Sequence, residues 1–209
     1  MRTDTLSYDN MTHRLSDFII QFTVMKFSIF FLFENLADPV LKEKLKLKRY
    51  ISYPHKVLPD QAPIIITGME IISIVEESAE YKKHSYKDAC DALTRMSSHW
   101  NRTKFLNATF ELIMNYLDGL DKPEKKRLSK KLFNEEWFRV LFVLRNNASH
   151  HDNYGKQIEW SFKEEKIQFQ GIIINKNDIG HKIRYNDAEL FNLLEYTYAY
   201  FIENRAIFS

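Results

Sequence analysis

The fold is decided by residues 137–150, which read WFRVLFVLRNNASH. The first eight residues of this stretch are apolar except for Arg139, and a helix that is apolar on nearly every side must lie in the centre of a core. The last six residues are almost all polar. Because buried polar groups need hydrogen-bond partners, we expect this end of the helix to meet other polar side chains, a second subunit or a ligand.

Further helices are predicted on both sides of this stretch. Asn134 is expected to cap the central helix, with acidic residues in its first turn. An N-terminal helix is expected to begin near Asn10 or Ser16 and to end before Asp38-Pro39. Asn186 and Glu189 form a predicted capping pair for an amphipathic C-terminal helix. Apolar spacing and helix-breaking residues predict the remaining helices at 40–50, 64–81, 86–99, 103–117 and 123–131.

Between the central and C-terminal helices the pattern changes to alternation with a period of two. Ile158, Trp160 and Phe162 alternate with polar residues, and a second alternating run follows Glu164-Glu165. Two such runs around a polar turn predict a β-hairpin, and residues 181–185 are a candidate third strand. We therefore predict one mostly α domain, 1–209, built as a helical bundle with a β-hairpin insertion at 156–185 before the C-terminal helix.

The composition favours a folded helical protein. Hydrophobic residues make up 44% and aromatic residues 14% of the 209 residues, which argues against a disordered chain, and five Gly with five Pro argue against a turn-rich β protein. Thirty basic against twenty-eight acidic residues give a net charge of +2, so any nucleic-acid contact must come from local patches. The single cysteine, Cys90, excludes an intramolecular disulfide and is expected to be a buried, inert thiol.

One apolar segment, 18–33, needs a decision about membranes. It reads FIIQFTVMKFSIFFLF and is interrupted by Gln21 and Lys26. A helix that spans a bilayer needs roughly 20 apolar residues. We therefore expect a core or dimer-interface helix, no membrane partner and a cytoplasmic protein.

The polar end of the central helix has the residues needed for phosphodiester chemistry. The guanidinium of Arg145 can hold a phosphate through its fork of donors, and His150 can exchange a proton near neutral pH. Asn146 and His150 are four residues apart and therefore share a helical face. Cleavage of RNA by its own 2′-hydroxyl needs acid–base help and charge stabilisation but no metal or cofactor.

This segment resembles the motif of the HEPN superfamily, which is Arg, a polar residue, three variable residues and His near the end of a central helix. The resemblance implies catalytic roles for Arg145 and His150, with Asn146 orienting them or the substrate. It also implies a homodimer in which both motifs line one RNA-cleaving cleft. Many members are toxins or phage-defence proteins, so a neutralising antitoxin is a candidate partner. His151 gives the longer spacing that the family also shows, and Asn147 is a supporting candidate.

Other interpretations of the same residues stay open. The cluster could be a helix C-cap, in which Asn147 or Asn153 ends the helix. His150-His151-Asp152 also resembles the core of metal-dependent phosphohydrolases, for which His99 and Asp118 would be the remaining candidate ligands. The chain could also be a HEPN-like module that binds RNA, a nucleotide or a protein without cutting anything.

A basic run just before the central helix is the candidate RNA-contacting surface. Charge runs on helices are usually solvated faces, but a run beside an RNA-binding cleft can contact phosphates. Its members are Lys125, Lys126, Arg127, Lys130 and Lys131.

Overall fold

The computed structural model describes residues 6–46, 49–52, 64–150, 160–178 and 183–209, and for 49–52, 64–68, 70 and 148–150 it describes the backbone only. The chain forms two compact units, Met1–Val24 with Trp100–Ser209 (unit 1) and Met25–His99 (unit 2). The described residues form eight α-helices and two antiparallel two-stranded sheets. The prediction of a mostly helical chain with a β-hairpin before the C-terminal helix is confirmed. The prediction of one domain stays a prediction.

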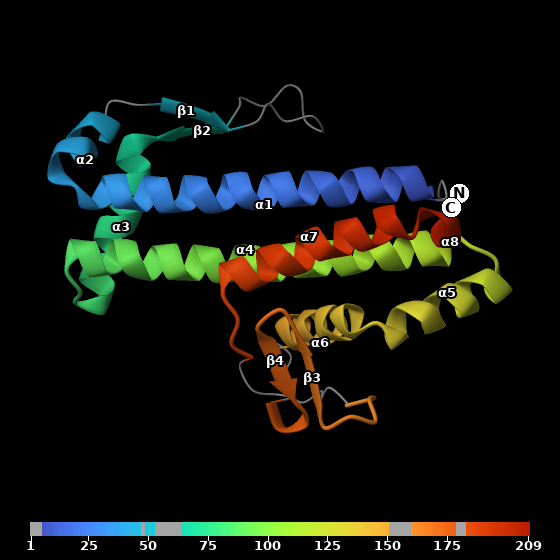
Figure 1. Ribbon diagram of the computed structural model, residues 1–209. Coiled ribbons are helices and arrows are strands. Elements are labelled where there is room, and N and C mark those ends of the chain that lie inside the picture. Colours follow the sequence, from blue (N-terminus) through green and yellow to red (C-terminus); the bar gives the residue numbers. More distant parts are fainter. Residues whose placement is uncertain (1–5, 47–48, 53–63, 151–159, 179–182) are drawn as a thin grey trace. The chain divides into compact units, whose positions relative to one another are not determined.

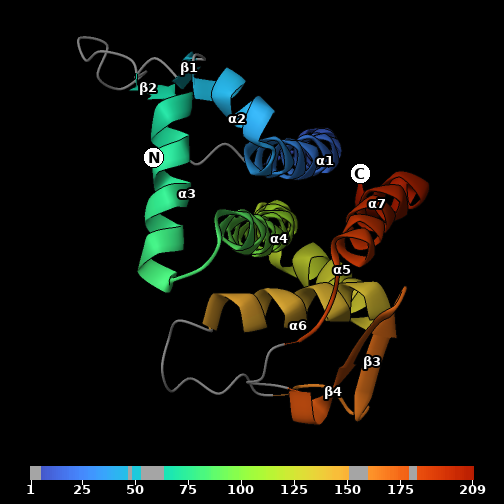
Figure 2. The same ribbon diagram turned by 90° about the vertical axis from the view of Figure 1, so that its left-hand side faces the viewer.

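Unit 1 is built around helix α6 (Glu136–His150). Figures 1 and 2 show α6 between the C-terminal part of α4 (Tyr86–Asp118) and the hairpin of β3 (Lys166–Phe169) and β4 (Ile172–Asn175). Aromatic rings join α6 to its neighbours: the Phe110 and Phe138 centroids are 5.8 Å apart, and those of Phe133 and Phe138 are 5.1 Å apart. Helix α6 contributes six buried residues to the core, which accounts for its predicted central position. They are Trp137, Phe138, Val140, Leu141, Val143 and Leu144.

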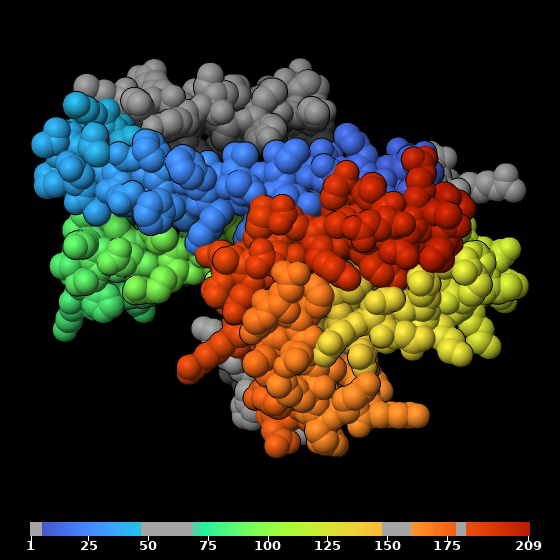
Figure 3. Space-filling model, in the orientation of Figure 1, coloured from blue at the N-terminus to red at the C-terminus, as the bar shows by residue number. Residues whose placement is uncertain are grey.

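The C-terminal helices close unit 1. Helix α7 (Asp187–Glu203) begins with the predicted capping box, because the Asn186 side chain accepts from the Glu189 backbone and Glu189 accepts from the Asn186 backbone. The hydroxyl of Tyr8 donates to the Phe201 carbonyl, and that of Tyr116 donates to the Phe208 carbonyl at the end of α8 (Arg205–Phe208). Figure 3 shows α7 (red), the hairpin (orange) and α5 (yellow) on the visible surface of this unit.

The hairpin uses different residues from those predicted. Its tight turn is Gln170-Gly171, with positive φ values of 42° and 93°, and not Glu164-Glu165. Residues 160–165 are not a strand, so the predicted strand that included Trp160 and Phe162 is wrong over its described part. Trp160 Nε1 instead donates to the Glu164 carbonyl at 2.7 Å, which turns the chain there. Residues 183–185 are not a strand either, whereas 158, 159, 181 and 182 lie outside the described residues.

Unit 2 contains the rest of α1 (Tyr8–Ala37) and α4, together with α2 (Pro39–Lys46), α3 (Gly68–Lys82), β1 (Arg49–Ser52) and β2 (Ile64–Thr67). The predicted helix 40–50 is wrong at its C-terminal end, and the predicted helix 64–81 is wrong at its start. Residues 49–52 and 64–67 instead pair as antiparallel strands. Residues 64–67 read IIIT, and β-branched side chains favour strands. The described core of this unit is small and consists of Leu36, Ile72, Val75, Ala79, Ala89 and Cys90.

Two further helix boundaries differ from the predictions. The predicted helices 86–99 and 103–117 are one continuous helix, α4, because no Gly or Pro separates them and Asn101 is buried within it. Helix α5 (Lys122–Asn134) includes Asn134, so the break before α6 falls at Glu135, which has extended backbone angles. Glu135 also accepts the backbone N–H of Arg139 and thereby starts α6 in place of Asn134.

Helix α1 is largely exposed along the predicted apolar segment. Among the described helices, it is the one long and apolar enough to cross a membrane, although a core helix or a signal sequence passes the same test. Only 11% of the apolar 18-residue window within α1 is buried, so this part of the helix is not fully enclosed in a core. The interface interpretation stays a prediction. The exposed large apolar residues of this stretch of α1 are Ile20, Val24, Met25, Phe27, Phe30 and Phe31.

Candidate functional site

Helix α6 carries the whole Arg145–His150 motif on one continuous helical backbone. The apolar residues that precede the motif are buried, so the helix position is fixed by packing before the polar residues begin. Because the helix continues to His150, Asn147 does not end it. The Asn147 version of the C-cap interpretation is therefore wrong, and Asn153 lies outside the described residues.

The guanidinium of Arg145 lies in a partly enclosed polar and aromatic setting. Its Nη1 donates to Asn146 Oδ1 at 3.0 Å, and its Nη2 lies 3.7 Å from Glu111 Oε1 on α4. The central carbon of the guanidinium is 5.4 Å from the centroid of the Phe110 ring, a distance suited to a cation–π contact. The Arg145 side chain is 28% exposed, so solvent still reaches part of it.

One donor of Arg145 is unsatisfied. Nε is buried and has no hydrogen-bond partner among the described residues. A buried donor without an acceptor costs about 1–3 kcal/mol. Among the described residues, Arg102 Nε and Arg139 Nε are in the same state, so this feature alone does not distinguish Arg145. Burial closes Nε to solvent, so the guanidinium is anchored at Nη1 and can take a further oxygen acceptor at Nη2.

The remaining motif residues are only partly described. Asn147 is buried and Asn146 is half-buried. The side chain of His150 and all of His151 lie outside the described residues. The structure therefore brings Arg145 and Asn146 together, whereas the expected approach of either histidine stays a prediction.

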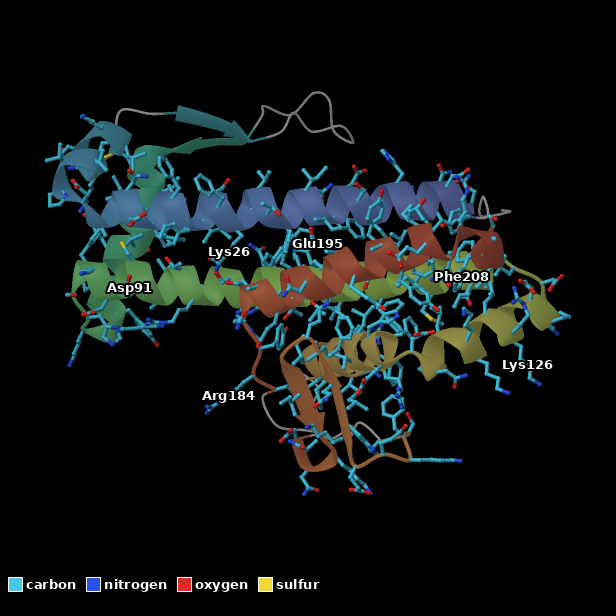
Figure 4. All side chains as sticks on the ribbon, in the orientation of Figure 1. Lys26, Asp91, Lys126, Arg184, Glu195 and Phe208 are labelled. Carbon is cyan, nitrogen blue, oxygen red and sulfur yellow. The ribbon has the colours of Figure 1, made fainter. Side chains whose placement is uncertain are left out.

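The basic run on α5 is divided between paired and exposed side chains. Lys125 Nζ lies 2.6 Å from Asp118 Oδ1, and Arg127 donates to Glu124 and to the Ile207 carbonyl. The Arg127 hydrogen bond lowers the pKa of the Glu124 carboxyl. Lys126 and Lys130 are exposed and Lys131 is half-buried; Figure 4 shows Lys126 extending away from α5. None of the five makes a described hydrogen bond or ion pair with Arg145.

The described side chains provide no cluster of metal ligands for the phosphohydrolase interpretation. Among them, no three His, Cys, Asp or Glu side chains gather in a way that would hold a metal ion. Asp118, one of its two additional candidate ligands, is paired with Lys125. The side chains of His150, His151 and Asp152 themselves are not described.

A groove of unit 1 lies elsewhere, away from the motif. It measures about 550 Å³, and its described lining includes Tyr196, Glu195 and Asn192 of α7, Ile19 of α1 and Gln170 of the hairpin turn, but no motif residue. Its volume lies within the range of ligand sites. We favour the Arg145 surroundings for chemistry, because the groove lining contains no Lys, Arg or His.

Sequence reasoning missed Glu111 and Phe110. Both lie on α4, 34 and 35 residues before Arg145, and nothing in the local pattern indicates that this part of α4 faces α6. Comparison of the chain with protein-family models, with curated proteins and with solved structures finds no match.

Proposed function

We propose that the chain is a metal-independent endoribonuclease of the HEPN type, acting as a homodimer with a composite site. The placement of Arg145 carries the proposal: Asn146 anchors its guanidinium, Nη2 has only a loose described partner, and His150 follows little more than one turn later on the same helix. The motif resemblance supplies the reaction class, and the surroundings of Arg145 support it.

In this proposal the 2′-oxygen of RNA loses its proton and bonds to phosphorus as the bond to the 5′-oxygen breaks. The leaving 5′-oxygen gains a proton, and a 2′,3′-cyclic phosphate remains on the upstream fragment. Arg145 binds the phosphate and stabilises the charge that develops on its oxygens. His150, or His151 at the longer spacing, transfers one of the two protons, and Asn146 holds the guanidinium in place.

The exposed lysines of α5 would contact RNA phosphates away from the cut. Lys126 and Lys130 are exposed, four residues apart on one helical face, and have no described acidic partner. Lys125 and Arg127 have carboxylate partners and would contribute less, and half-buried Lys131 completes the set. A toxin or phage-defence setting in the cytoplasm, with a neutralising antitoxin, would follow from the HEPN resemblance.

A second candidate function is a HEPN-like module that binds a partner without cutting RNA. The separate groove beside Tyr196 favours it, because a surface cavity of about 550 Å³ is within the range of ligand sites. Both candidates predict binding, and only the first predicts cleavage.

The deciding experiment incubates the purified protein with mixed RNA in EDTA, beside Arg145→Ala, Arg145→Lys and His150→Ala. We expect the wild type to leave 2′,3′-cyclic phosphate ends. Each variant should cut at least about 100-fold more slowly, including Arg145→Lys, because lysine keeps the charge but loses the fork of donors. Arg139→Lys is the matched control: its guanidinium pairs with Glu164 of the 160–165 turn, and cleavage should persist. Intact RNA, or equal cleavage by all folded variants, would reject the nuclease.

A further inference from the structure

Glu111 is a loosely held partner of Arg145. Its Oε1 lies 3.7 Å from Arg145 Nη2, beyond the 2.7–2.9 Å typical of charge-assisted hydrogen bonds. The Glu111 side chain is 60% exposed and extends from α4, so it can move without disturbing the core. Ion pairs as exposed as this one contribute little to folding stability. A role for Glu111 is therefore to be sought in ligand binding.

The two sides of the Arg145 guanidinium are occupied differently. Nη1 is fixed by Asn146, and Phe110 packs near the guanidinium. The opposite edge consists of Nε and Nη2, which are the parallel donors that bind two oxygens of a carboxylate or phosphate together. Here Nε has no described acceptor and Nη2 has only the distant Glu111. Because Nε is buried, an oxygen from solvent can reach this edge only at Nη2, where Glu111 is a distant partner.

We propose that Glu111 is a place-holder for the RNA phosphate, an inference that rests on the proposed ribonuclease function. In the free protein it balances the charge of Arg145. When a phosphodiester arrives, one of its non-bridging oxygens binds Nη2, and the Glu111 carboxylate turns into solvent. Glu111 is thus a specificity-determining residue that competes with the substrate and takes no part in proton transfer.

The test is Glu111→Gln, which removes the negative charge and keeps the shape of the side chain. Glu203→Gln is the matched control: it removes the same charge from an exposed position at the end of α7, outside the separate groove. The probe is a short fluorescent 2′-O-methyl RNA, which has no attacking hydroxyl and cannot be cut. Its dissociation constant is measured by anisotropy at fixed salt for each protein.

We expect Glu111→Gln to bind the probe about two- to fivefold more tightly than the wild type, as loss of a weak competing ion pair predicts. Glu203→Gln should bind the probe as the wild type does. With cleavable RNA, the KM of Glu111→Gln should fall by a similar factor while kcat stays unchanged. If Glu111 instead orients Arg145 for catalysis, the variant will bind no better and its kcat will fall, and the inference is overturned.

The remaining outcomes separate this inference from the proposed function. Tighter probe binding by Glu111→Gln, with no cleavage of natural RNA by any protein, would support the place-holder and reject the nuclease. Equal tightening in Glu203→Gln would assign the effect to net charge and overturn the place-holder. The absence of probe binding by both the wild type and Glu111→Gln at low salt would overturn it as well.

Discussion

Cys90 shows how burial controls the chemistry of a single side chain. The thiol is 1% exposed, and burial together with the nearby charge of Asp91 raises its pKa. Because the thiolate is the reactive form, native Cys90 should be slow to react. We expect a disulfide reagent to label almost no thiol in the folded protein within minutes, and one thiol per chain in urea. Rapid labelling of the native protein would show that the α4 segment around Cys90 opens readily.

The candidate site illustrates what single residues reveal in sequence. The closeness of Arg145 and Asn146 at the polar end of an apolar helix could be predicted from the sequence, because both lie in one helical segment. Glu111 and Phe110 were not, since their closeness to Arg145 depends on how α4 packs against α6. Residues brought together by tertiary packing leave no trace in local spacing.

The hairpin turn offers a test of local strain at the level of one element. Gly171 has φ +93°, and a Cβ there would lie 3.0 Å from Glu189 Oε1 on α7. Gly171→Ala should therefore lower the free energy of unfolding by about 1–2 kcal/mol. Gln170 has φ 42°, a conformation that Asn tolerates better than Gln. Gln170→Asn should therefore raise the free energy of unfolding by roughly 0.5 kcal/mol. Urea unfolding would measure both, and a neutral Gly171→Ala would show that the turn can relax.

Elements were predictable where local pattern and tertiary packing agree. Helix α7 combines a capping box with an apolar face, and its start was predicted to the residue. The alternating run at Trp160 and Phe162 failed because Arg139 binds Glu164 at 2.7 Å and Trp160 donates within the same segment, which favours a turn over a strand. Strands β1 and β2 were missed because the apolar run at 64–67 was assigned to the helix that follows it. Its pairing with 49–52 joins two segments separated by 11 residues and cannot be read from local pattern.

At the scale of the whole molecule, the two units differ in the size of their cores. Helix α3 of unit 2 packs into a core of six buried residues among those described, whereas α6 alone contributes six to the core of unit 1. Less buried apolar surface means a smaller free energy of local opening. In hydrogen exchange, we expect amides of α3 to exchange at least about tenfold faster than those of α6. Equal rates in both helices would mean that the units unfold as one cooperative body.

The proposed dimer makes the strongest demand on the whole molecule. One chain has a mass of 25.0 kDa, so sedimentation should give about twice that value. If both motifs line one cleft, a mixed dimer of Arg145→Ala and His150→Ala chains still has one Arg145 and one His150 in that cleft. We therefore expect two inactive variants to regain part of the wild-type cleavage after they are unfolded together and refolded.

The control for this experiment is each variant refolded alone, which should stay inactive. Random exchange makes about half of the refolded dimers mixed, so recovered activity should stay below half of the wild-type value. A mixture that stays inactive while forming stable dimers would mean that each cleft needs both copies of Arg145 and His150. A monomeric wild type that still cuts RNA would mean that the motif works within one chain, because no partner would then be available to complete the site.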